Sequence, residues 1–138
     1  MYEKILVPVD GSEHSKRALN EAIKVAKMTG GTITLLHVQP KRAPLIPPAK
    51  PQDKEASQSA AQSILADGKR IVEAEGVSVQ TLLLEGNVVD QIVKTAKEGQ
   101  FGLVVVGARG LSKLEEIMMG SVSHGVAENA PCPVIVTR

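Results

Sequence analysis

The chain has 138 residues, a length typical of one compact domain, and 43% of them are hydrophobic, which is enough to build a core. Its 16 basic and 15 acidic residues leave a net charge of +1, so the charge gives no reason to expect a nucleic acid or an anionic membrane as partner. Tyr2 and Phe101 are the only aromatic residues. The core must therefore be aliphatic, and the stacking platforms of single-strand nucleic-acid binders are missing.

Cysteine usage and hydropathy point to the cytoplasm. Cys132 is the single cysteine, so no intrachain disulfide can form, which fits a reducing compartment. No apolar run approaches the length of a membrane span, and the N-terminus begins a strand at once instead of a charged leader and apolar signal core. We expect a soluble cytoplasmic protein.

The first third of the chain predicts a βαβ unit. Lys4–Val9 is a short apolar run that ends in the turn Asp10-Gly11-Ser12, where Asp10 or Ser12 can cap a helix. Apolar residues then recur at helical spacing over Glu13–Met28, and Thr32–Val38 is rich in β-branched residues, as strands are. The crossover between the two strands should be right-handed.

A proline-rich stretch follows the second strand. Gln39–Gln52 holds five of the eight prolines and cannot be a regular helix or an interior strand. It predicts a surface loop, either a lid near a ligand or a tolerated insertion. Helical spacing resumes over Asp53–Glu75, with inward positions expected at Ala61, Ile64, Leu65, Ile71 and Val72.

The second half continues the alternation of strands and helices. Four consecutive apolar residues, Leu103–Val106, suit a strand buried on both faces. Asn87 is positioned to cap the helix that precedes this strand. The predicted elements are strands at Ser78–Glu85, Leu103–Ala108 and Pro133–Thr137, and helices at Val88–Glu98 and Val122–Asn129. This order predicts an α/β fold: a five-stranded, parallel, doubly wound, Rossmann-like sheet with helices on both faces, forming one domain over residues 1–138.

Glycines after the buried strand suggest an anion site. Gly107 and Gly110 are followed, after nine intervening residues, by Gly120 and Ser121, where a short helix begins. Glycines let a ligand approach main-chain amides, and the first amides of a helix lack intrahelical partners. Amides and hydroxyls here can hold a triphosphate. Neither G-x-x-x-x-G-K-[ST] nor G-x-G-x-x-G occurs, which excludes a P-loop and a Rossmann dinucleotide fingerprint.

This glycine spacing resembles the nucleotide-binding signature of the ATP-binding branch of the universal stress protein family. The opening YEKILVPVDGSEHSKRAL and the closing NAPCPVIVTR resemble that family's first and last strands, so the likeness covers essentially the whole chain. The resemblance implies the strand order 3-2-1-4-5. It also implies a regulatory protein that binds ATP together with Mg²⁺.

The resemblance also assigns roles to individual residues. The nucleoside would be bordered by Pro8, Val9 and Asp10, the adenine would meet the backbone of Val38, and the ribose would lie at Gly107. The phosphates would be held by Ala108, Arg109, Gly110, Gly120, Ser121, Val122 and Ser123. Arg109 and Lys113 can add positive charge or simply be solvated. Asp10 either contacts the nucleoside or Mg²⁺, or serves only the turn.

Catalytic groups are scarce in the sequence. His14, His37 and His124 are scattered over a helix start, a strand and a late helix, which is typical of structural histidines, and no acidic cluster suggests a metal site. Without a general base or lysine clamp, hydrolysis should be slow. One alternative is an enzyme of the PP-loop ATP pyrophosphatase type. Such enzymes carry a Ser-Gly-Gly-x-Asp-Ser loop after the first strand, and the turn at Asp10 stands at that place but lacks the pair of glycines. Another is an interaction module without nucleotide.

The last strand predicts a homodimer. In the implied strand order, Pro133–Thr137 lies at an edge of the sheet, yet it is apolar, whereas exposed edges are usually blunted by charge or a bulge. Pairing with its copy about a two-fold axis would cover it, and the resemblance implies the same contact. Shielding by a loop or by the chain terminus is the alternative.

Overall fold

The computed structural model describes residues 2–40, 51–108 and 120–138. Three residues with a predicted role, Arg109, Gly110 and Lys113, lie outside the described residues, as does most of the proline-rich loop. The structure therefore tests neither the phosphate contacts expected of Arg109 and Gly110 nor the hypothesis that the proline-rich loop is a lid.

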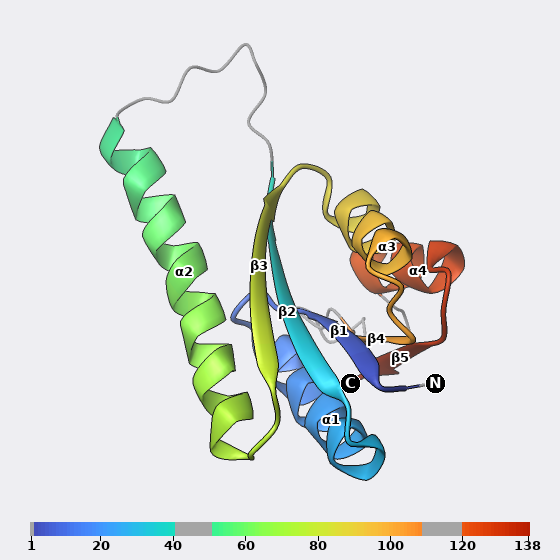
Figure 1. Cartoon of the computed structure of the whole chain (residues 1–138). Helices are drawn as coiled ribbons and strands as arrows, with labels where there is room; N and C mark the ends of the chain where they lie inside the picture. The colour runs from blue at the N-terminus through green and yellow to red at the C-terminus, as the bar shows by residue number, and fades with distance from the viewer. Residues whose placement is uncertain (1, 41–50, 109–119) are drawn as a thin grey trace.

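Strands and helices alternate along the chain, as the sequence predicts (Figure 1). The elements are β1 (Lys4–Pro8), α1 (Glu13–Thr29), β2 (Thr32–Gln39), α2 (Pro51–Ala74), β3 (Val79–Glu85), α3 (Val88–Glu98), β4 (Leu103–Gly107), α4 (Ser121–Asn129) and β5 (Val134–Thr137). All neighbouring strands are parallel, in the order β3-β2-β1-β4-β5. The predicted fold class and strand order are confirmed.

The two element boundaries on either side of the proline-rich stretch differ from the prediction. β2 continues through Gln39, which pairs with Glu85 of β3. α2 begins at Pro51, two residues before the predicted start. Proline suits the first helical position because the N–H that it lacks would have no intrahelical partner there. The other predicted ends either match or differ by a single residue, as helix and strand ends commonly do.

The sheet forms the middle of three layers. Ile5 and Val7 of β1 contact one core cluster, which includes residues of α1 and α2, whereas Leu6 contacts a second, which includes residues of α3 and α4. The two helix pairs lie on opposite faces of the sheet (Figure 1). Leu103–Val106 are all at most 4% exposed, which confirms a strand buried on both faces.

One predicted core position of α2 is wrong. Ile71 is 38% exposed, while its neighbour Val72 is fully buried. The buried stripe of α2 runs through Ala61, Leu65, Gly68 and Val72 at spacings of four and three, and Ile71 lies off this line. Gly68 belongs to the stripe because a Cβ there would approach Leu35 Cδ1 to 2.9 Å.

The sheet opens between its two central strands. β1 and β4 pair only at Ile5–Leu103 and Leu6–Val104, although both strands continue beyond these pairs. After β1 the chain enters α1 on one face, whereas the helix that follows β4, α4, packs on the other face. Ligands of open α/β sheets bind at such a switch point, beyond the carboxyl ends of the strands.

Candidate functional site

A cavity of about 280 Å³ lies at this opening. It brings together many of the residues that the sequence assigns to a ligand, from three strands and one helix: Pro8, Val9, Asp10, Val38, Gly107, Ala108 and Val122. Further lining residues were not predicted: Ser12, His14, Ser15, Leu36, His37, Val88, Ile92 and Val106. The aliphatic members of both sets give the cavity an apolar wall, and the hydroxyl, imidazole and carboxylate groups give it a polar one.

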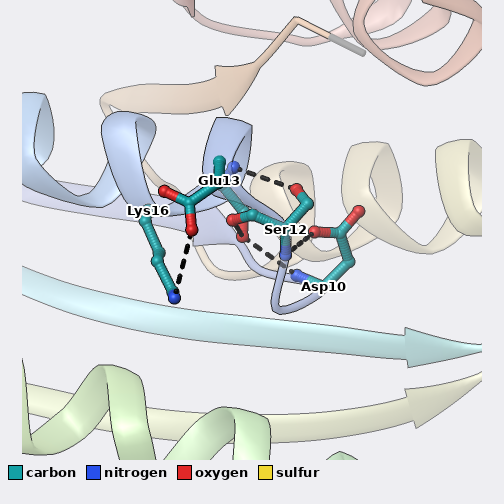
Figure 2. A network of polar contacts seen from close by, with 5 residues as sticks. Asp10, Ser12, Glu13 and Lys16 are labelled. Atoms are coloured by element: carbon teal, nitrogen blue, oxygen red, sulfur yellow. Dashed lines mark hydrogen bonds and ion pairs between the residues drawn. The ribbon is translucent and has the colours of Figure 1, made fainter. Parts of the chain in front are cut away.

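The turn after β1 sets the position of Asp10. The Asp10 carboxylate accepts a hydrogen bond from the Ser12 amide at 2.9 Å, and Gly11 has a φ of 84°, which favours glycine. Ser12 is the cap of α1, because its hydroxyl accepts from the Ser15 amide at 3.2 Å (Figure 2). Asp10 therefore makes the turn, and Ser12 makes the cap. The exposed Glu13–Lys16 ion pair at 3.5 Å adds little stability.

The Asp10 carboxylate is held in its ionised form. Burial by itself raises its pKa. Hydrogen bonds with the side chain and backbone of Ser12 and the side chain of Ser15, together with the charge of nearby His37, lower it by more, so the net pKa lies below its ordinary value. The polar wall of the cavity therefore carries a negative charge at neutral pH.

His37 joins the polar wall through a backbone contact. Its Nδ1 lies 2.7 Å from the carbonyl oxygen of Val9, the residue that follows β1. The Val9 amide in turn donates to the Leu36 carbonyl at 2.8 Å. The sequence interpretation of His37 as a scattered structural histidine missed its place in the cavity. The available signal was its position directly before Val38, near the carboxyl end of a strand.

Gly107 is required by the packing of α1. A Cβ at this position would lie 2.4 Å from the carbonyl oxygen of His14 and 2.5 Å from its carbonyl carbon. The main chain at the start of α1 thus passes where a side chain would be. A contact between Gly107 and a ribose stays a prediction, because close packing already accounts for the glycine.

The start of α4 borders the cavity through Val122 and has no side-chain cap. Gly120 is the N-cap residue, and it makes no side-chain cap bond. Ser123 is fully buried, and its hydroxyl donates to the Gly120 carbonyl at 3.0 Å, which shapes the first turn. Ser121 is exposed. Of the two serines, Ser121 is therefore the one whose side chain is accessible to a phosphate.

Metal clusters and membrane spans are not features of the described chain. Within residues 2–40, 51–108 and 120–138, no group of three or more His, Cys, Asp or Glu residues is placed to hold a metal ion. No helix in these ranges is long and apolar enough to cross a membrane. His124 contacts Glu128 at 3.1 Å on the exposed face of α4 and does not line the cavity.

The sequence and fold resemble those of proteins of known class. The model of the Universal stress protein family matches residues 1–138. Universal stress protein YxiE of Bacillus subtilis is 32% identical, with 100% of each chain covered. UspA from Lactobacillus plantarum has a TM-score of 0.86 at 30% identity, with 99% of this chain and 98% of that chain covered. A universal stress protein from Archaeoglobus fulgidus in complex with dAMP has a TM-score of 0.75 at 27% identity, covering 99% and 98%.

These matches extend over the whole chain in both sequence and structure. The chain belongs to the universal stress protein family.

Proposed function

We propose that this protein is a regulator that binds ATP with Mg²⁺ in the cavity between β1 and β4. The observation that carries the proposal is the position of the cavity: it lies at the switch point of the sheet, with an apolar wall, an ionised carboxylate and a helix lining it. The relative from Archaeoglobus fulgidus, which forms a complex with dAMP, supports an adenine nucleotide as the ligand.

The apolar wall suits a purine base. Leu36, Val38, Ile92, Val106 and Val122 come from both sides of the opening and surround a volume of about 280 Å³. This volume is close to the lower end, about 300 Å³, of the range for small-molecule sites, which are mostly apolar with a few polar groups. Ring faces are desolvated at little cost against such a wall.

The start of α4 suits the phosphates. Val122 lines the cavity, so the first turn of the helix borders it, and a helix start without a side-chain cap favours an anion. Gly120 has φ −65° and ψ 162°, a conformation open to any residue, so its backbone angles do not require a glycine. Close approach of a phosphate to the amides supplies a reason for it.

The donor set permits Mg²⁺ but does not form a dedicated metal site. Mg²⁺ prefers oxygen ligands and is commonly held by one or two carboxylates together with substrate phosphates. Asp10 is the one acidic residue among the described residues that line the cavity, and its lowered pKa keeps it ionised. Asp10 would therefore hold the ion directly or through water, with the phosphates supplying the remaining oxygens.

Slow hydrolysis follows from the same lining. Among the described residues of the cavity there is no lysine or arginine to stabilise charge on a leaving phosphate. A bound nucleotide would therefore persist, which suits a sensor or switch better than an enzyme.

The test is a calorimetric titration of the purified full chain with ATP and Mg²⁺, after mass spectrometry of the denatured protein has identified any nucleotide that co-purifies. We expect saturable binding at about micromolar affinity and phosphate release well below about 10 per second. Absence of binding by nucleotide-free protein would refute the proposal. Enzyme-like release rates would favour an ATPase.

We further propose that β5 forms the interface of a homodimer. β5 lies at an edge of the sheet and pairs with β4 alone among the described strands. Ile135 is 37% exposed, and Val134 and Val136 are half-buried, so the edge presents aliphatic side chains next to open backbone groups. Antiparallel pairing with a second copy would satisfy these backbone groups and cover the side chains.

Light scattering of Ile135→Lys tests this interface. We expect the native chain to scatter with twice the 14.6 kDa mass of one chain, and Ile135→Lys to scatter with the mass of one chain at low micromolar concentration. Two lysines brought together across the axis would repel each other, and the partly exposed position should tolerate lysine in the folded monomer. Thr81→Lys, at an exposed position on the opposite edge strand β3, is the control and should stay dimeric. A native monomer, or a dimeric Ile135→Lys, would contradict the interface.

A further inference from the structure

We propose that His37 determines which nucleotide the cavity prefers, because its Nε2 accepts a hydrogen bond from a donor group of the bound nucleoside. The inference rests on the proposed function and extends it to specificity. It assigns a side-chain contact to a residue that neither the glycine pattern nor the backbone contact expected at Val38 involves.

The ring of His37 is oriented by the main chain. Its Nδ1 lies 2.7 Å from the Val9 carbonyl oxygen, and the neighbouring amide of Val9 is tied to the Leu36 carbonyl at 2.8 Å. The contact therefore joins a side chain on strand β2 to a carbonyl whose own residue is fixed by a backbone hydrogen bond. The side chain is half-buried, which further restricts the ring.

This orientation also decides which ring nitrogen carries the proton. A carbonyl oxygen can only accept a hydrogen bond, so Nδ1 must be the donor. In the neutral ring the other nitrogen, Nε2, then has a lone pair and accepts. Within the part of the chain that the structure describes, Nε2 has no protein hydrogen-bond partner, and it is not one of the polar atoms sealed from solvent.

The surroundings make an acceptor at this place selective. His37 lines the same cavity as Asp10. The polar wall thus offers two acceptors to a ligand. Nucleosides carry matching donors, namely the hydroxyls of the ribose and the exocyclic amine of adenine. A nucleotide that lacks the donor facing His37 would leave a desolvated acceptor unpaired, which costs affinity.

Two substitutions separate the two nitrogens of His37. In His37→Asn the side-chain amide nitrogen can take the place of Nδ1 and keep the bond to Val9, but no acceptor remains at the position of Nε2. In His37→Gln the longer side chain brings an amide group to the position of Nε2, so an acceptor is retained while the bond to Val9 is lost. Both variants should fold, because the side chain is only half-buried.

The experiment is a titration of the native chain and both variants with ATP, ITP, 2′-deoxy-ATP and 3′-deoxy-ATP, each with Mg²⁺. ITP lacks the exocyclic amine, and the two deoxy compounds each lack one hydroxyl. In the native chain, the compound that lacks the donor facing His37 should bind about three- to tenfold more weakly than ATP, the worth of one hydrogen bond. The compound affected identifies whether the base or the sugar supplies the donor.

In His37→Asn this preference should disappear, and in His37→Gln it should persist. A preference that is unchanged in His37→Asn, or absent from the native chain, would overturn the assignment. Persistence of the preference in His37→Asn together with its loss in His37→Gln would assign the effect to the placement of Val9 and would also overturn it. If the native chain binds none of the four compounds, the proposed function itself fails.

Discussion

Replacing Gly120 by valine is expected to weaken ATP binding by more than about a hundredfold and to leave the fold intact. The Cβ and branched side chain would occupy the space through which a phosphate reaches the first amides of α4, and loss of two such bonds accounts for a factor of this size. The fold should survive, because φ −65° and ψ 162° suit valine and the glycine makes no side-chain cap bond. Calorimetric titration with ATP and Mg²⁺, together with thermal unfolding, measures both effects.

Ala127→Val is the matched control for Gly120→Val. It adds the same β-branched side chain to the same helix, at an exposed position towards its other end. Its affinity for ATP should equal that of the native chain. If folded Gly120→Val binds ATP as tightly as the control does, the phosphates do not lie at the start of α4.

Replacing Gly107 by alanine should produce the largest loss of stability of any single methyl addition proposed for this chain. The new Cβ would lie 2.4 Å from the His14 carbonyl oxygen, and that oxygen belongs to the main chain of α1 and cannot rotate away. α1 would have to shift from β4. Overpacking of this kind costs about 3 kcal/mol, which corresponds to a fall in melting temperature of about 10 °C for a chain of this size.

Urea unfolding of Gly107→Ala and of Gly30→Ala separates overlap from backbone strain. Gly30 has a φ of 70° and open space around its Cβ position, so alanine there costs only the conformational penalty of about 1 kcal/mol. Equal stability of the two variants would mean that the extra methyl at Gly107 costs no more than backbone strain does at Gly30, and the packing explanation for Gly107 would be wrong.

Gly107 and Gly120 show how one sequence pattern can contain two kinds of glycine. The spacing from Gly107 to Gly120 predicts a common role around an anion. The structure separates the two, because a Cβ at Gly107 would lie 2.4 Å from the carbonyl oxygen of His14 in α1. Gly107 and His14 are about ninety positions apart in sequence. No local pattern contains the information that α1 would begin at that place.

The histidines show the same limit. His14, His37 and His124 look equivalent in sequence, each a single histidine in a different element. His14 and His37 line the cavity, and His124 lies on the exposed face of α4. The difference arises from the switch point, which brings the ends of β1 and β2 and the start of α1 together.

The amino-acid sequence by itself determined the order of strands and helices, the cap at Asn87 and the buried central strand, because hydrophobic periodicity and capping act over a few neighbouring residues. Three features were decided only by the tertiary structure. β1 and β4 stop pairing after Leu6 and Val104, the main chain of α1 packs closely against Gly107, and the His37 side chain contacts the Val9 carbonyl. These features depend on contacts between residues distant in the chain, and such contacts are set by the packing of whole elements against one another.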